Sequence, residues 1–181
     1  MIVIGVLTGL LASGVKISSR INTAAVFVKI IIILLFIFIG IGHIDSNNYS
    51  PFIPPNEGTW EKYGWSGVFH ASTTVFFAYI GFDSVSTTAQ EAKNPQRDLP
   101  IGIIGSLVIC TILYIAVSAV LTGVQKYTQI SIGAPVANAL PYYWLTILID
   151  FGALFGLFSV ILVLLLGQPR ILQAMAVRFA H

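Results

Sequence analysis

Long apolar runs separated by short polar segments dominate the pattern of this chain. The first long run contains IIIILLFIFIGIG, and three further runs of similar character follow it. A helix needs about 20 consecutive, mainly apolar residues to cross a bilayer, so the pattern predicts four full transmembrane helices. The predicted spans are residues 22–42, 67–88, 101–123 and 144–167. Residues 1–15 are also apolar but too short to cross, so we expect a partial span in which the chain begins inside a helix.

The polar segments between these runs are predicted to be loops. Pro100 precedes the third span, and proline is favoured in the first turn of a helix. The last outer loop is long enough for a short helix over residues 135–140. The predicted cytoplasmic loops are residues 16–21, 89–100 and 168–181, and the predicted outer loops are residues 43–66 and 124–143.

The distribution of basic residues predicts the orientation of the spans. Lys62 and Lys126 lie on one side, Lys29 lies inside a span, and six cations lie on the other side. Because cytoplasmic loops carry an excess of lysine and arginine, both chain ends and loop 89–100 are expected in the cytoplasm of a multi-pass cell-membrane protein. The six cations are Lys16, Arg20, Lys93, Arg97, Arg170 and Arg178.

The composition supports a membrane protein and excludes several other classes. Apolar residues make up 56% of the chain, charged residues 9%, and the mean hydropathy is +0.90, whereas soluble proteins carry about 25% charged residues. A net charge of +2 gives no basis for a nucleic-acid partner. The single cysteine, Cys110, is interpreted as a small buried apolar residue. No HExxH, CxxC, GxSxG or Walker sequence occurs, so neither enzyme activity nor a metal or other cofactor is expected.

The second predicted span changes character in the stretch FFAYIGFDSVSTT. Gly81 and the carboxylate of Asp83 interrupt the apolar run, and hydroxyl side chains follow them. A charged group at bilayer depth is costly and faces protein or water, and hydroxyls next to a glycine suit a locally unwound helix. Unwound helices present backbone groups to substrates in many transporters. The alternative is that the span ends near Phe82 and the rest is a polar cytoplasmic extension.

Lys29 is the second ionisable group within a predicted span. It lies nine residues after Arg20, or about 13 Å along a helix at ~1.5 Å per residue. One interpretation is that its flexible stem snorkels to the membrane surface. The other is a buried ammonium that takes up and releases a proton and so supplies one removable positive charge.

Four further polar residues have weaker claims to a function. Asp150 lies near the outer end of the last span, where a solvated or capping role is favoured over substrate binding. Ser159 lies deeper in that span, where a serine usually bonds to its own backbone. His43 and His70 are interpreted as interfacial residues.

Four stretches of the sequence resemble one transporter superfamily. The run FFAYIGFDSVSTTAQEAKNPQRDLPIGIIGSL resembles the sixth-span region of the amino acid–polyamine–organocation superfamily, in particular its cationic amino acid transporter family. GVKISSRINTAAVFVKI resembles the end of the fourth span and the fifth span of that family. GAPVANAL and LIDFGALFGLFSVILVLLLGQPRILQAMA resemble the seventh–eighth loop and the eighth span. The resemblance covers nearly the whole chain in the right order.

The resemblance implies an all-α integral membrane fold, namely a fragment of the five-plus-five inverted-repeat (LeuT-like) transporter fold, with residues 1–181 as one membrane domain. It implies part of a secondary active amino acid permease, with proton-coupled uptake of cationic or broad-range amino acids. The implied partners are the amino acid substrate, the proton and the lipid bilayer.

The resemblance also assigns roles to residues of this chain. The substrate would be held at an unwound helix, where Phe77 stacks over it or gates it and Asp83 supplies negative potential. Lys29 would replace a coupling sodium ion, with Ser159 as its hydrogen-bond partner, and residues 135–140 would form part of an outer lid. The implied substrate-binding residues are Phe77, Ala78, Tyr79, Ile80, Gly81 and Asp83.

The chain departs from the family in extent. Nothing in it resembles spans one to three or spans nine onward, and the glycine-rich first span that binds the substrate carboxylate has no counterpart. We therefore expect an incomplete permease that does not transport alone and that pairs with the missing permease segments or another membrane subunit. The alternative is a small accessory or assembly subunit. An intramembrane enzyme is disfavoured because no nucleophile and base are paired.

Overall fold

The computed structural model describes residues 15–60, 63–79, 94–130 and 133–179. These ranges are helical and contain no strand. The α-helices are α2 (Val15–Ile41), α3 (Gly64–Phe76), α4 (Pro95–Val124) and α5 (Tyr143–Phe179), and the short 3-10 helices are η1 (Ser46–Tyr49) and η2 (Phe77–Tyr79). Within the described ranges, three segments are long and apolar enough to cross a membrane: Arg20–Ile41, Pro95–Val124 and Tyr143–Pro169. The expected all-α membrane fold is confirmed.

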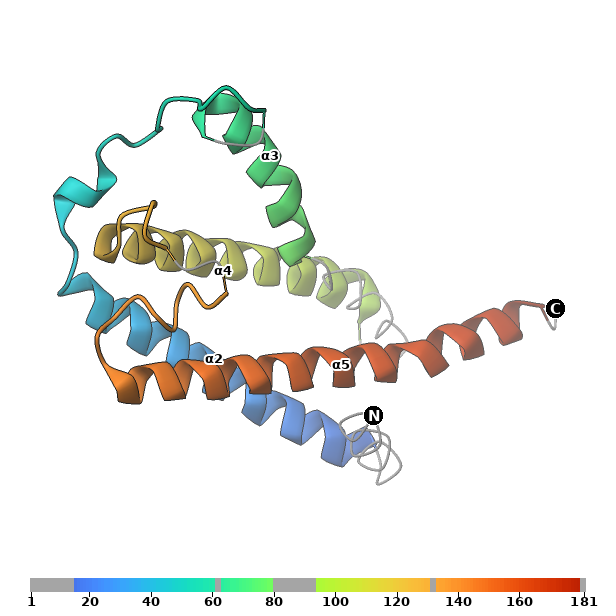
Figure 1. The fold of residues 1–181 in the computed structure, drawn as a ribbon. Coiled ribbons are helices and arrows are strands. Elements are labelled where there is room, and N and C mark those ends of the chain that lie inside the picture. Colours follow the sequence, from blue (N-terminus) through green and yellow to red (C-terminus); the bar gives the residue numbers. More distant parts are fainter. Residues whose placement is uncertain (1–14, 61–62, 80–93, 131–132, 180–181) are drawn as a thin grey trace.

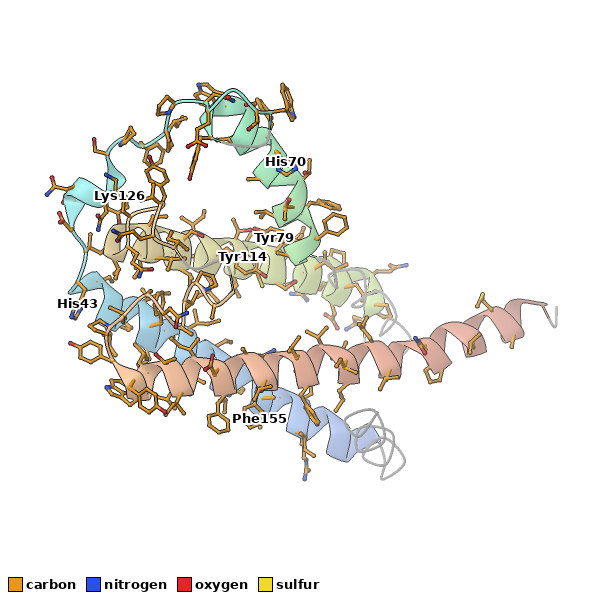
Figure 2. All side chains as sticks on the ribbon, viewed as in Figure 1. His43, His70, Tyr79, Tyr114, Lys126 and Phe155 are labelled. Carbon is orange, nitrogen blue, oxygen red and sulfur yellow. The ribbon has the colours of Figure 1, made fainter. Side chains whose placement is uncertain are left out.

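Two of the long helices run in one direction and the third runs in the other. Figure 1 shows α2 and α4 running the same way and α5 returning in the opposite direction along α2. The C-terminal ends of α2 and α4 therefore lie at one end of the molecule, where His43 and Lys126 follow them (Figure 2). The other end holds the beginnings of α2 and α4 and the end of α5.

Helix α4 begins at Pro95, earlier than the predicted start after Pro100. The backbone N–H groups of Arg97 and Asp98 both donate to the carbonyl of Asn94, and Asp98 Oδ2 accepts from the Asn94 N–H group at 3.3 Å. This reciprocal pairing satisfies donors that the first turn leaves free. Pro100 lies inside the helix, in its second turn, where proline cannot supply the N–H group that would bond to the Gln96 carbonyl.

The described helices also differ in length from the other predicted spans. Helix α5 continues through Pro169 to Phe179, so much of the predicted loop 168–181 is helical. Helix α3 has 13 residues and η2 follows it directly. Residues 80–88 of the predicted second span lie outside the described residues.

The segment before α5 forms a single turn instead of the predicted helix over 135–140. The Asn138 N–H group donates to the Ala134 carbonyl at 3.1 Å, and the chain then extends toward Leu140, which is 6% exposed. Thr146 on α5 donates to the Ala137 carbonyl at 2.9 Å. With these contacts the chain leaves the helical path after Asn138 and places Leu140 in the core beneath α2.

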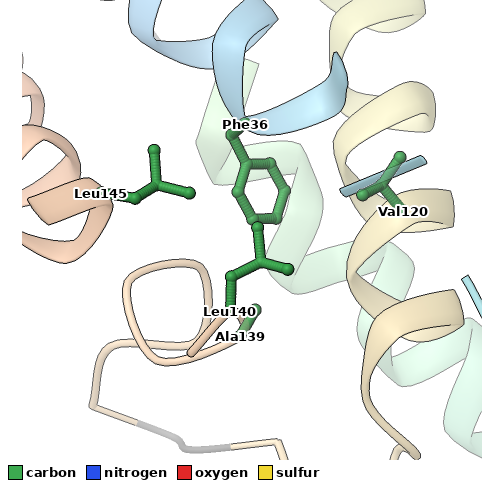
Figure 3. Packing of buried hydrophobic residues seen from close by; sticks show 5 residues of the cluster. All are labelled: Phe36, Val120, Ala139, Leu140 and Leu145. Carbon is green, nitrogen blue, oxygen red and sulfur yellow. The ribbon is translucent and has the colours of Figure 1, made fainter. Parts of the chain in front are cut away.

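The main apolar core lies where this turn meets the three long helices. Phe36 of α2 and Leu145 of α5 are each 1% exposed, and Figure 3 shows them packed with Val120, Ala139 and Leu140. Lipid tails are as apolar as these side chains, so close packing stabilises this junction more than exclusion from water does. Cys110 of α4 is exposed, so its interpretation as a buried residue is wrong.

The C-terminal end of α4 is held by the loop that follows α2. The Gly123 carbonyl accepts from the Asp45 N–H group at 3.0 Å and from Asn48 Nδ2 at 2.8 Å. The Tyr49 hydroxyl donates to the Ala119 carbonyl at 2.8 Å. The last carbonyls of a helix lack intrahelical donors, so Asp45 and Asn48 supply partners to Gly123 that α4 itself cannot.

Gly40 allows α2 to approach α4 closely, which generates a stability prediction. A Cβ atom at Gly40 would overlap Val120 Cγ1, whereas a Cβ atom at Gly105 of α4 meets nothing within 4 Å. We expect Gly40→Ala to lower the free energy of unfolding by about 1–3 kcal/mol because it overpacks the junction. The thermal midpoint of the natural protein carrying this sequence, measured in detergent, checks this.

Gly105→Ala is the matched control and should leave that midpoint unchanged or slightly raised, because alanine favours a helix more than glycine does. Adding Val120→Ala to Gly40→Ala should recover part of the loss by removing the overlapping methyl groups. Equal midpoints for the Gly40 and Gly105 variants would show that the close approach does not limit stability.

Candidate functional site

The first candidate site lies where α3 ends. The α-helix stops at Phe76, and the Phe77 N–H group donates to the carbonyls of both Thr74 and Val75, which tightens the chain into the 3-10 turn of η2. The Phe77 ring is 67% exposed and lies edge-on to Phe76 at a centroid distance of 6.3 Å. This change of helix type falls inside the predicted second span, in the stretch where the sequence predicts unwinding.

Helix α4 holds this turn through two hydroxyl side chains. The Tyr114 hydroxyl donates to the Ala78 carbonyl at 3.0 Å, and the Tyr79 hydroxyl lies 3.0 Å from Thr111 Oγ1. The rings of Tyr79 and Tyr114 meet edge-on, with centroids 5.3 Å apart and planes at 86° (Figure 2). Side chains of α4 thus contact both the backbone and the last side chain of η2.

Sequence reasoning did not identify Thr111 and Tyr114. The available signal was their spacing: residues three apart share one face of a helix, and two hydroxyl-bearing side chains on one face of a lipid span need partners inside the protein. The pattern TILY carries that signal at residues 111–114.

Three of the predicted substrate residues are placed and three are not. Phe77, Ala78 and Tyr79 form η2. Ile80, Gly81 and Asp83 lie outside the described residues. The roles assigned to all six stay predictions.

The second candidate site lies between α2 and α5. Lys29 is half-buried on α2, and a Cβ atom at Gly156 of α5 would lie 3.5 Å from its Cδ atom. One turn earlier on α5, a Cβ atom at Gly152 would lie 3.0 Å from Ile32 Cδ1. Glycines four residues apart let helices approach closely in membranes. A Cβ atom at Gly152 would crowd Ile32, whereas one at Gly156 would meet the Lys29 stem at ordinary contact distance. The motif GALFG at residues 152–156 is the sequence signal for this contact.

Ser159 lies on the same face of α5 and is hydrogen-bonded to α2. It is 4% exposed, and its hydroxyl donates to Asn22 Oδ1 of α2 at 2.6 Å. Asn22 lies about two helical turns before Lys29. The expected hydrogen bond between Lys29 and Ser159 stays a prediction. The bond between Asn22 and Ser159 fixes the register of α2 against α5.

The remaining polar candidates lie on the surface of the described structure. His43 Nδ1 donates to the Ile39 carbonyl at 3.0 Å, so its Nε2 accepts from the Tyr142 hydroxyl at 3.2 Å. His70 is exposed on α3, and Asp150 is exposed on α5. Within the described ranges, no three histidine, cysteine, aspartate or glutamate side chains are grouped in a way that could hold a metal ion.

The structure thus places the predicted residues in two separate groups. Lys29 and Ser159 belong to the α2–α5 interface, while Phe77, Ala78 and Tyr79 lie against α4. The first group places the stem of a lysine against Gly156 of α5. The second offers an exposed aromatic ring at a change from α-helix to 3-10 turn, an arrangement that suits binding more than bond-making chemistry.

Comparison with known proteins identifies the family. The model of the amino acid permease family matches residues 1–178. The methylthioribose transporter of Bacillus subtilis (strain 168) is 44% identical over 178 residues, which are 97% of this chain and 37% of that protein. The branched-chain amino acid permease BcaP of the same organism is 43% identical over 179 residues, again 97% of this chain and 37% of that protein.

A plant relative shows the same pattern. The chloroplastic cationic amino acid transporter 9 of Arabidopsis thaliana is 43% identical over 173 residues, covering 94% of this chain and 29% of that protein. The chain spans 29–37% of the length of these curated relatives. The resemblance seen in the sequence is confirmed. The chain belongs to the amino acid permease family, a family of multi-pass membrane transporters, not enzymes, within the amino acid–polyamine–organocation superfamily.

Proposed function

We propose that this chain carries one half of the substrate site of a secondary active permease that takes up cationic or broad-range amino acids together with protons. The single observation that carries the proposal is the change from α-helix to 3-10 turn at Phe77–Tyr79, inside an apolar segment and held by α4. Broken helices near the membrane midplane present backbone groups and helix-end dipoles to substrates.

The exposed Phe77 ring is the proposed contact for the apolar part of the substrate. The backbone from Tyr79 to Gly81 would accept hydrogen bonds from the substrate amino group, since the carbonyls at a helix end lack intrahelical donors. Asp83 would add negative potential and so favour a cationic side chain. The names of the relatives include methylthioribose, branched-chain and cationic amino acid transporters, so the family alone does not select the substrate.

Lys29 is the proposed site of proton coupling. It is the one lysine in the described spans Arg20–Ile41, Pro95–Val124 and Tyr143–Pro169. The Lys29 stem packs against α5 at Gly156, and the hydrogen bond between Asn22 and Ser159 holds the two helices in register. An ammonium that loses its proton removes a positive charge from this interface, as the release of a metal ion would.

The proposed orientation places the beginnings of α2 and α4 in the cytoplasm of the cell. Arg20 and Arg97 lie at this end, near the end of α5, and Lys126 lies at the opposite end. The positive-inside tendency supports this assignment.

The proposal is tested by exposing the natural protein that carries this sequence to a panel of amino acids. We expect L-arginine and L-lysine to raise its thermal midpoint and to enter proteoliposomes faster when the outside is acidic. No stabilisation and no uptake by a folded protein would contradict the permease proposal and favour an accessory subunit.

Lys29→Met is expected to abolish accumulation driven by a pH gradient, because methionine fills the same space without carrying a proton. Lys126→Met is the matched control, since Lys126 is exposed on the outer loop. Uptake of labelled L-arginine with and without an imposed pH gradient measures the effect. Gradient-driven accumulation that survives in Lys29→Met would remove Lys29 from the coupling mechanism.

Asp83→Asn is expected to reduce the preference for L-arginine over L-leucine by about tenfold, or ~1.4 kcal/mol, because the carboxylate charge is lost. Asp150→Asn removes a carboxylate from the exposed surface of α5 and serves as the control. Competition between the two amino acids for uptake gives the ratio. The same ratio in Asp83→Asn and in the parent would rule out this specificity role.

A further inference from the structure

We infer that Thr111 and Tyr114 of α4 are positioning residues of the substrate site, and that their side chains fix the geometry of the turn Phe77–Tyr79. The inference rests on the proposed function, because it assigns a task to residues that support the proposed site. Neither residue needs to touch the substrate. Both act through η2.

The hydrogen bonds at this contact form a directed chain. Thr111 Oγ1 donates its single hydrogen to the Leu107 carbonyl at 2.7 Å. It can therefore only accept at its other contact, so the Tyr79 hydroxyl, 3.0 Å away, is the donor there. Tyr114 independently donates to the Ala78 carbonyl at 3.0 Å. Two successive residues of the turn are thus bonded to α4.

The hydrogen bond from Tyr114 gives a backbone carbonyl a partner where the bilayer offers no water. Where an α-helix is interrupted in lipid, its freed carbonyls must find donors within the protein. The Tyr114 hydroxyl is such a donor for the Ala78 carbonyl. A carbonyl oxygen can accept two hydrogen bonds, so this bond fixes the direction of the Ala78 carbonyl and leaves one acceptor position open.

The two anchors together restrict the turn more than either one does. Thr111 and Tyr114 are three residues apart, which places them about 4.5 Å apart along one face of α4 at ~1.5 Å per residue. One anchor bonds to a side chain of η2 and the other to its backbone, so the turn resists both sliding and rotation. The edge-on contact of the Tyr79 and Tyr114 rings adds an orientation-dependent contact.

The chain offers matched bonds of the same chemistry away from this turn. Tyr49 donates its hydroxyl to the Ala119 carbonyl of α4 at 2.8 Å, in the outer loop region. Thr122 bonds to the Ser118 carbonyl of its own helix at 2.8 Å. These two side chains reproduce the tyrosine–carbonyl bond and the threonine back-bond without contacting η2.

The test compares Tyr114→Phe and Thr111→Val with the controls Tyr49→Phe and Thr122→Val in the natural protein that carries this sequence. The measurements are KM and the maximal rate of L-arginine and L-leucine uptake into proteoliposomes, together with the thermal midpoint without substrate. Thr111→Ser keeps the hydroxyl and serves as the conservative variant.

We expect Tyr114→Phe and Thr111→Val each to raise KM for both amino acids roughly 3- to 10-fold, the effect of one lost hydrogen bond, with little change in maximal rate. The two control variants and Thr111→Ser should keep the parental KM. The double variant should lose less than the product of the single effects, because both side chains restrain one turn.

Two contrary outcomes are separable. If the parent shows neither uptake nor substrate-induced stabilisation, the proposed function fails. If the parent transports but Tyr114→Phe and Thr111→Val keep the parental KM, or lose only thermal stability to the same extent as the controls, the positioning role is overturned while the proposed function stands. If Tyr114→Phe does not fold, the Thr111→Val and Thr111→Ser pair decides the same question.

Discussion

The need to satisfy every backbone polar group within the membrane governs this structure. A continuous helix meets that need internally, and α2 does so over its apolar length. Helix α3 passes into a 3-10 turn at Phe77 while the surrounding sequence is still apolar. Tyr114 of α4 donates to the Ala78 carbonyl of this turn, so a neighbouring helix helps to satisfy its backbone. The geometry of the turn after α3 therefore depends on the helix beside it.

The packing of α2 against α5 also depends on individual polar contacts. Among its described residues, this interface includes a hydrogen bond between Ser159 and Asn22 and a close approach at Gly152. Packing against lipid-like surfaces gives little preference for one register over another, so a polar bond and shape matching select it. Lys29 lies within this interface, where a change in its charge would alter the electrostatic environment of both helices.

Much of the fold and part of the candidate site followed from the sequence. The lengths of the apolar runs predicted the long helices, and the family motif around the FFAYIGFD stretch predicted the superfamily and the region of the break. Helix ends were predicted less well. Pro100 was expected to begin α4, but Asn94 and Asp98 stabilise an earlier start, and residues 135–140 form a turn because Leu140 is needed in the core.

The sequence by itself determined that this chain lies in a membrane, how many residues each apolar helix offers, and which family it belongs to, because hydropathy and local motifs are properties of the linear chain. Only the tertiary structure decided the partners: Asn22 for Ser159, and Thr111 and Tyr114 for the turn after α3. The physical reason is that a partner depends on the rotation and axial offset of two helices. Apolar side chains can face lipid or protein equally well, so the rotation and the axial offset are undetermined until the helices pack.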